Sequence, residues 1–449
     1  MSKNIILDYE QANEKLDEIA NNGLIKEIEN LSITEHGLPI RNFIVGEGES
    51  DIVITGATHG QEIISTDFII KMMENINAKR DEWNSILKEF RIHFIPMLNP
   101  EGYLISTSAV RELIPRDMES KEAEVICKEY AEAYKRDALN EPKNIKEYQE
   151  MFKGIDYNCI PDKYRDIKES VKNLFDKYPD MPKWCLHMWS ANGNGIDVQA
   201  NCEYNPSIDK INNDEQLFMS QNRFDNINIA HPGPINCPFD KEKGFKLENE
   251  TMAISNLLEQ LDKENRLFAY FNYHGTGAII YQRPASGSEE LDFSQEEVSR
   301  KEIENYMLSR AYADSTIKHN SNDKKYRIVT RDYPVSSTND ILRLKYQQDL
   351  LIELSEMIGN PIAPYGDIEG NYTDTINSNM DAVKHSLKVA SLAQMVSRFL
   401  YEKINTLTDK DSYLKKAELI DLVYAEFKKR VSALDNSIVK NDKEKEDEI

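Results

Sequence analysis

The sequence His59-Gly60-Gln61-Glu62 contains two side chains that can bind a metal ion. It follows an apolar run at residues 51–55 and a turn of small residues, and it precedes apolar residues at helical spacing. A histidine and a glutamate three residues apart, on a turn that enters a helix, can converge on one ion. The pattern alone is weakly specific, because a surface histidine and glutamate at the start of a helix give the same spacing.

His274 offers a third potential ligand. It ends a run of aromatic and apolar residues, 267–273, and is followed by glycine and threonine. In open α/β sheets, sites form at the carboxyl ends of the strands. Catalytic zinc takes three protein ligands, commonly His nitrogen and carboxylate oxygen, and leaves a position for water. His59, Glu62 and His274 therefore predict a zinc site, whereas a histidine such as His274 taken alone is more often structural than a ligand.

The elements that must position these residues alternate between strand and helix. Helical patterns occupy residues 9–31, 63–73, 247–263, 293–319 and 377–401, and strand patterns occupy residues 39–45, 51–55, 92–96, 267–273, 326–330 and 350–354. Strand–turn–helix–strand order is typical of α/β proteins. We expect a mixed, largely parallel central sheet flanked by helices.

Two segments differ in composition from this pattern. Residues 104–185 are charged and helix-prone, which predicts a helical insertion over one face of the sheet. Such an insertion either borders the site and narrows access to it or acts as a stabilising cap. Residues 402–449 are also highly charged, and they predict a helical appendage with a disordered end beyond an α/β domain of residues 1–401.

The charge balance excludes some classes of partner. The 449 residues include 78 acidic and 55 basic side chains, which give a net charge of −23. Nucleic acid and anionic membranes need a basic surface, so neither is an expected partner. The N-terminal residues lack the apolar run of a signal peptide, and no stretch approaches a membrane span. The five cysteines form no CxxC pair; we therefore expect free thiols and a cytoplasmic location.

Several ordered blocks of the chain resemble the zinc carboxypeptidase family. The resemblance covers roughly residues 30–400, with insertions, and it is carried by ITGATHGQE (54–62), MLNPEGY (97–103), GIDVQAN (195–201), FNYHGTGAIIY (271–281) and SSTNDILRLKYQQDLLIEL (336–354). It implies a metallocarboxypeptidase-like fold that binds one zinc ion and hydrolyses a peptide or amide bond.

The resemblance also implies roles for individual residues. His59, Glu62 and His274 match the family's zinc ligands. Glu353 matches the glutamate that takes a proton from the zinc-bound water and passes it to the leaving amine. Asp197 matches a carboxylate that orients a zinc histidine, and Tyr333 lies near the position of a mobile substrate-binding tyrosine. A packed aromatic residue is the alternative for Tyr333.

The chain departs from the family at the carboxylate clamp. The family's Asn-Arg pair, which holds the substrate's C-terminal carboxylate, is replaced here by Gln199-Ala200. Loss of a planar bidentate cation should weaken carboxylate binding substantially. Arg111 is the best candidate for a replacement cation and could also polarise the scissile carbonyl; the other candidates are Arg116, Arg283 and Arg343.

The departure leaves the bond that is cleaved open. A carboxypeptidase-like enzyme and a specialised amidase or endopeptidase on modified or γ-linked peptides both fit the sequence. An acyl-amino-acid deacylase is a further alternative, and a non-catalytic binding protein fits less well because the ligands and the base are all present. Gln199 retains an amide that could meet a polar group of a modified substrate.

Overall fold

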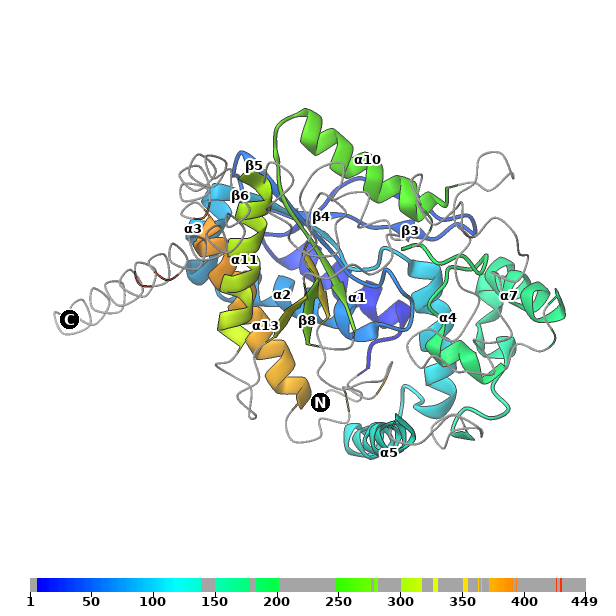
Figure 1. Cartoon of the computed structure of the whole chain (residues 1–449). Coiled ribbons are helices and arrows are strands. Elements are labelled where there is room, and N and C mark those ends of the chain that lie inside the picture. The colour runs from blue at the N-terminus through cyan, green and yellow to red at the C-terminus, as the bar shows by residue number, and fades with distance from the viewer. Residues whose placement is uncertain are drawn as a thin grey trace, which may run out of the picture.

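The computed structural model describes most of the α/β region (Figure 1). The described residues are 6–138, 150–177, 179, 183–199, 201, 247–275, 278–281, 300–316, 326–329, 350–353, 362, 365, 371–390, 393, 425 and 429. Most of the expected appendage at residues 402–449 lies outside them, as do Tyr333, Ala200, Arg283 and Arg343. Among the described residues, no helix is long and apolar enough to cross a membrane.

The core of the molecule is an eight-stranded sheet with the order β1-β4-β6-β5-β7-β10-β8-β9. The strands are β1 (Lys26–Glu27), β4 (Phe43–Val45), β5 (Ser50–Thr55), β6 (Phe90–Ile95), β7 (Leu267–His274), β8 (Ile279–Tyr281), β9 (Arg327–Val329) and β10 (Leu350–Glu353). β6, β5, β7 and β10 are parallel neighbours, whereas β4 and β8 join this block antiparallel. The mixed, largely parallel sheet expected from the sequence is confirmed. β2 (Ser32–Ile33) and β3 (Pro39–Ile40) form a separate pair.

Helices cover both faces of this sheet (Figure 1). On one face, Ile52 and Ile54 of β5 belong to an apolar core shared with α1 (Tyr9–Asn22), α2 (Ile63–Ala78), α3 (Arg80–Glu89), α11 (Arg300–Thr316) and α13 (Asn371–Lys388). On the other face, Val53 packs in a smaller core with α10 (Asn249–Lys263). Alternate residues of one strand thus face opposite layers, which is why these central strands carry apolar residues on both faces.

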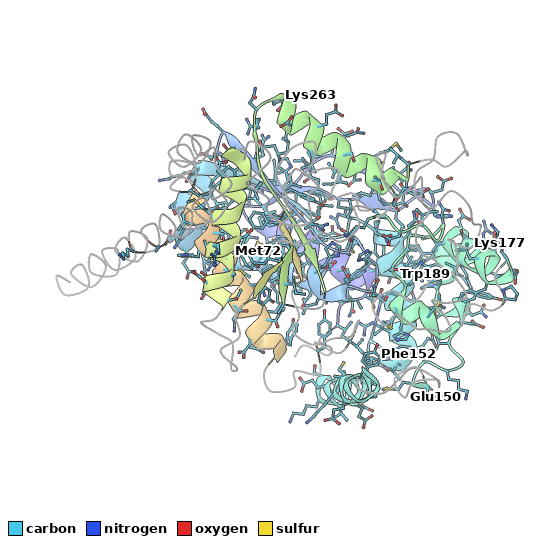
Figure 2. All side chains as sticks on the ribbon, viewed as in Figure 1. Met72, Glu150, Phe152, Lys177, Trp189 and Lys263 are labelled. Carbon is cyan, nitrogen blue, oxygen red and sulfur yellow. The ribbon has the colours of Figure 1, made fainter. Side chains whose placement is uncertain are left out.

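The described parts of the charged region from residue 104 to 185 are largely helical, with turns between the helices. This region contains most of α4 (Pro100–Leu113), then α5 (Ser120–Ala138), α7 (Arg165–Lys177) and short 3₁₀ turns at Tyr157–Cys159, Asp162–Tyr164 and Lys183–Met188. Aromatic rings join these pieces: Phe152 stacks on His187 with ring centroids 3.7 Å apart. Trp189 packs against Phe175 of α7, on the same side of the molecule (Figure 2).

A buried carboxylate holds the amino end of the central strands together. Asp51, in β5, is fully buried and accepts hydrogen bonds from Arg91 and His93 of β6 and from Arg266 just before β7. Burial opposes ionisation of Asp51, but these donors outweigh it and lower its pKa to about 2. The carboxylate therefore remains ionised at neutral pH and links three neighbouring strands.

Replacing this carboxylate is expected to destabilise the protein. Asp51→Asn should reduce the free energy of unfolding at pH 7 by about 3 kcal/mol, because it leaves two arginines without their partner. Since the folded pKa lies below the unfolded value of 3.8, this contribution is present above about pH 4 and is lost as the pH falls toward 2. Urea unfolding at pH 7 and pH 3 measures both effects. Asp176→Asn, which breaks the exposed pair with Lys172, should change nothing measurable; equal effects of the two variants would contradict the assignment.

Candidate metal centre

The sheet brings the predicted ligands together at the carboxyl ends of two neighbouring strands. β5 and β7 are parallel, and Thr55 at the end of β5 is in register with Asn272 of β7. The Asn272 side-chain oxygen accepts hydrogen bonds from the hydroxyls of Thr55, at 2.9 Å, and Thr58, at 3.0 Å. The turn that carries His59 is thereby fastened to the strand that ends in His274.

The turn between β5 and α2 is tightly constrained. The Ala57 backbone N–H donates to the Ser65 hydroxyl at 2.8 Å, and that hydroxyl donates to the Glu62 carbonyl at 2.7 Å. A Cβ at Gly60 would lie 2.1 Å from the carbonyl carbon of Gly102, so only glycine fits there. α2 consequently begins directly after Glu62, which places His59 and Glu62 on one side of the turn.

His59, Glu62 and His274 converge within hydrogen-bonding distance. One oxygen of Glu62 lies 2.9 Å from Nδ1 of His59, and the other lies 2.8 Å from Nδ1 of His274. The two Nδ1 atoms are 3.2 Å apart. All three residues are buried, with at most 5% of each exposed. Two imidazole nitrogens and one carboxylate thus face a common point.

The donor set and its spacing fit zinc. Among the described residues, these three form the only group of histidine, cysteine or carboxylate side chains close enough together to hold a metal ion. Two nitrogens bound to one tetrahedral zinc at about 2.1 Å are about 3.4 Å apart, close to the separation observed here. In addition, Nε2 of His274 is buried and has no hydrogen-bond partner among the residues that the structure describes. The three buried, polar side chains therefore form a chemically suitable set of zinc ligands.

The charges of the three residues are strongly coupled. Burial opposes the charged form of His59, but the carboxylates of Glu62 and Asp197 raise its pKa well above the usual range. Burial likewise opposes ionisation of Glu62, but His274 and His59 hold its pKa well below the usual range. Glu62 is therefore ionised, and a bound cation would take the place of the proton on Nδ1 of His59.

Asp197 lies at the other ring nitrogen of His59. Its Oδ1 is 3.5 Å from Nε2 of His59 and accepts the backbone N–H of Gln199 at 2.9 Å. A carboxylate at the second nitrogen of a metal-binding histidine fixes its ring orientation and tautomer. Asp197 thus lies beside His59, and its role as an orienting carboxylate stays a prediction. Gln199 follows in the same turn and is partly exposed.

Glu353 ends the strand next to His274. β10 is parallel to β7, and Glu353 is in register with His274. Its backbone therefore lies at the same edge of the sheet as the three ligands; its side chain lies outside the described part of the structure. The placement agrees with a role for Glu353 beside the metal.

Arg111 lies in a different part of the molecule. Its guanidinium donates to the Asp8 carboxylate at 2.8 Å, to the Ile114 carbonyl at 3.0 Å and to the Ile6 carbonyl at 2.6 Å. Arg116 also pairs with Asp8. Both arginines thus fasten α1 to the end of α4, and no described contact joins them to the metal ligands. The expectation that Arg111 polarises or clamps the substrate gains no support from this placement.

Asn99 and a group of buried carboxylates near it were not singled out by their chemistry in the sequence. Glu101, Glu248 and Glu250 are all at most 4% exposed. The amide of Asn192 donates to Glu248 at 2.8 Å and to Glu250 at 3.4 Å, and Glu101 pairs with His36 at 2.9 Å. The available signal was only local: Asn99-Pro100 is a typical start of a helix.

Glu250 should make stability depend on pH. Burial, together with the charges of Glu101 and Glu248, raises its pKa to about 8. Because the folded pKa lies above the unfolded value of 4.5, the free energy of unfolding should fall as the pH rises from about 4.5 to about 8. Glu250→Gln should remove that slope and stabilise the protein at pH 8 by on the order of 2 kcal/mol. Thermal unfolding at pH 5 and pH 8 measures this, with the exposed Glu264→Gln as control; identical slopes in wild type and Glu250→Gln would refute it.

Comparison with known protein families finds a match over the part of the chain that contains His59 and Glu62. The family model described as zinc carboxypeptidase matches residues 25–159, which include His59, Glu62 and the Asn99 segment. A search of curated proteins finds no significant match.

Solved structures similar to this chain include several carboxypeptidases. The chain is similar to bovine thrombin-activatable fibrinolysis inhibitor in complex with tick carboxypeptidase inhibitor, with 11% identity and a TM-score of 0.48 over 86% of this chain and 98% of the other. It is also similar to carboxypeptidase A from Helicoverpa armigera, with 11% identity and a TM-score of 0.49 over 87% and 74%. A metallo-carboxypeptidase from Burkholderia cenocepacia gives 10% identity and a TM-score of 0.43 over 87% and 70%. The match of this family model to residues 25–159 agrees with the resemblance to zinc carboxypeptidases that several blocks of the sequence carry.

Proposed function

We propose that this protein is a zinc-dependent metallopeptidase that hydrolyses a peptide or amide bond. The observation that carries the proposal is the convergence of His59, Glu62 and His274 at one buried point, with the two Nδ1 atoms 3.2 Å apart. When bound, zinc supplies a Lewis acid for a carbonyl oxygen and lowers the pKa of a water molecule. The chain's own residues must supply the orientation of the ligands and the proton transfers.

Each side chain then has a distinct task. Asp197 holds Nε2 of His59, so that Nδ1 is directed to the ion. Glu353 accepts a proton from the attacking water and delivers it to the leaving nitrogen, which avoids release of an unstable amide anion. The register of Glu353 with His274 supports this assignment. Arg111, whose guanidinium contacts Asp8, has no part in the proposal.

The substrate is proposed to differ from that of a standard carboxypeptidase. Gln199 and Ala200 stand where the family clamps a C-terminal carboxylate, so this position offers an amide and no cation. An amide can pair with a neutral polar group but cannot offset the negative charge of a desolvated carboxylate. Beside a carboxypeptidase-like enzyme, this observation supports a second candidate function: an amidase or endopeptidase that acts on modified or γ-linked peptides. Tyr333 remains a proposed substrate contact.

The cell compartment is proposed from the cysteines. The three that the structure describes, Cys127, Cys159 and Cys185, are free thiols. Burial raises the pKa of the Cys127 and Cys159 thiols to about 12, so they are unreactive. Free thiols are typical of a reducing compartment, and we infer a cytoplasmic location.

A panel of matched peptides tests the function. Each peptide is supplied with a free and with an amidated C-terminus, and γ-D-glutamyl peptides are included, with and without a zinc chelator. We expect hydrolysis that the chelator stops and that tolerates the amidated C-terminus. A strict requirement for a free C-terminus would exclude the amidase candidate, and turnover that persists without metal would refute the metallopeptidase.

A further inference from the structure

Asn99 links three segments that meet at the metal centre. It is fully buried and directly precedes α4. Its Oδ1 accepts the Gly102 backbone N–H at 2.8 Å, which caps the helix. Its Nδ2 donates to the Thr58 carbonyl at 3.4 Å and to the Ser190 carbonyl at 3.3 Å. One amide therefore both caps α4 and bridges two loops.

The two bridged loops carry His59 and Asp197. Thr58 directly precedes His59, and the Ser190 carbonyl also accepts the Gly60 backbone N–H at 3.2 Å. The chain between Ser190 and Asp197 is closed on itself by Asn192, whose backbone N–H donates to the Ile196 carbonyl at 2.9 Å. A shift at Ser190 is consequently carried to Asp197 through a short, internally bonded loop.

Glycines allow the backbones of these segments to touch. A Cβ at Gly102 would lie 2.4 Å from the Ala191 carbonyl oxygen, and one at Gly193 would lie 2.4 Å from Oε2 of Glu101. The Gly193 N–H also donates to Glu101 at 2.9 Å. With Gly60 against Gly102, the start of α4 is in direct contact with both loops. Such packing leaves little room for the loops to move independently.

We propose that Asn99 is a positioning residue that locks the loop carrying Asp197 onto the turn carrying His59, and thereby orients His59 toward the metal. The orientation of His59 toward a metal rests on the proposed function, whereas the joining of the two loops by Asn99 does not. The side chain is specific, because only an amide of this length offers both an acceptor for Gly102 and a donor for the two carbonyls. Serine and aspartate can cap the helix but provide no donor that reaches both carbonyls.

The capping and bridging roles can be separated by substitution. Asn99→Ser and Asn99→Asp retain an acceptor for the Gly102 N–H, and Asn99→Asp also sets a carboxylate against two carbonyl oxygens. The matched control is Asn379→Ser, since Asn379 is equally buried and bonds to Tyr312 and Tyr326, which lie on or beside α11. Both asparagines join separate elements, but Asn379 has no described direct contact with the three ligand residues and reaches the strand of His274 only through the hydroxyls of Tyr312 and Tyr273, which are 3.3 Å apart.

Two measurements on the full-length protein decide the matter. Zinc affinity is measured by competition with a chromophoric chelator, and hydrogen exchange at the Gly60 amide is measured without metal. We expect about tenfold weaker zinc binding for Asn99→Ser and more for Asn99→Asp, as for the loss of groups that orient metal ligands. Gly60 exchange should be faster in both. Asn379→Ser should lower the melting temperature while changing neither quantity by more than about twofold.

The possible results distinguish failure of the positioning role of Asn99 from failure of the proposed zinc-dependent function. Unchanged zinc affinity in Asn99→Ser would overturn the positioning role, even if exchange became faster. Wild-type protein that binds no zinc would refute the proposed function. Hydrogen exchange at Gly60 would then still test whether Asn99 holds the two loops together: faster exchange in the Asn99 variants would support this, and unchanged exchange would overturn it. If the Asn99 variants fail to fold, Glu101→Gln offers a second test, because Glu101 also joins the start of α4 to the loop carrying Asp197, through the Gly193 N–H. This variant should lose less zinc affinity than Asn99→Ser. Wild-type zinc affinity in folded Glu101→Gln would refute the positioning role.

Discussion

Glu353→Gln is expected to reduce the turnover number by about 10³-fold, the contribution of a well-placed general base and acid. Glutamine has nearly the same shape as glutamate but cannot accept the proton of the attacking water. The proposed metal ligands are His59, Glu62 and His274, so zinc content should be unchanged by this substitution. Single-turnover hydrolysis together with metal analysis measures both quantities.

A shorter carboxylate is the matched control for this variant. Glu353→Asp retains the proton acceptor but withdraws it by about one methylene, so an intermediate loss of turnover is expected because proton transfer depends on distance. Its dependence on pH should resemble that of the wild type. Full activity of Glu353→Gln, or loss of zinc from it, would show that Glu353 is not the base.

The convergence of His59, Glu62 and His274 could be predicted from the sequence because their signals are local. His59 and Glu62 share one turn, and His274 ends an apolar strand. Parallel strands bring their carboxyl ends to one edge of a sheet, so strand order was the only tertiary information needed. The observed β5–β7 pairing supplies it. The orienting role of Asp197 was implied only by the resemblance of its segment to the zinc carboxypeptidase family, and it stays a prediction.

Arg111 shows where sequence spacing misleads. It follows Asn99 by twelve residues, which suggested that it could reach the site. α4 is a continuous helix, however, and twelve residues of helix span about 18 Å. The helix begins beside the metal centre and carries Arg111 away from it, toward Asp8 at the start of α1. Whether a segment is one straight helix decides such distances, and charge patterns do not reveal it.

Asn99 and Asp51 show a second limit. Their roles depend on partners far away in the chain: Ser190 for Asn99 and Arg266 for Asp51. Neither residue type predicts such partners, since asparagine and aspartate are common in turns and at helix starts. A buried polar residue is informative only after its burial is known, because only then must it have a partner.

His274→Gln is expected to abolish the stabilisation of the protein by zinc. A ligand that binds only the folded state stabilises it by about 4 kcal/mol when its free concentration is about 1,000 times Kd. His274 provides one of the two imidazoles, with Nδ1 2.8 Å from Glu62 and 3.2 Å from Nδ1 of His59. Without it, two ligands remain, too few for the tetrahedral site of a catalytic zinc ion. Zinc should therefore raise the melting temperature of the wild type but not of the variant.

His187→Gln is the matched control, because His187 is also a buried histidine. It stacks on Phe152 and lies in the aromatic contacts beside α4, with no described contact to the metal ligands. Its replacement should lower the melting temperature of the metal-free protein through lost packing, yet leave the increase on adding zinc intact. An equal zinc response in His274→Gln and wild type would mean that the ion binds elsewhere. An equal loss in both variants would mean that the response reports general destabilisation, and not the loss of a ligand.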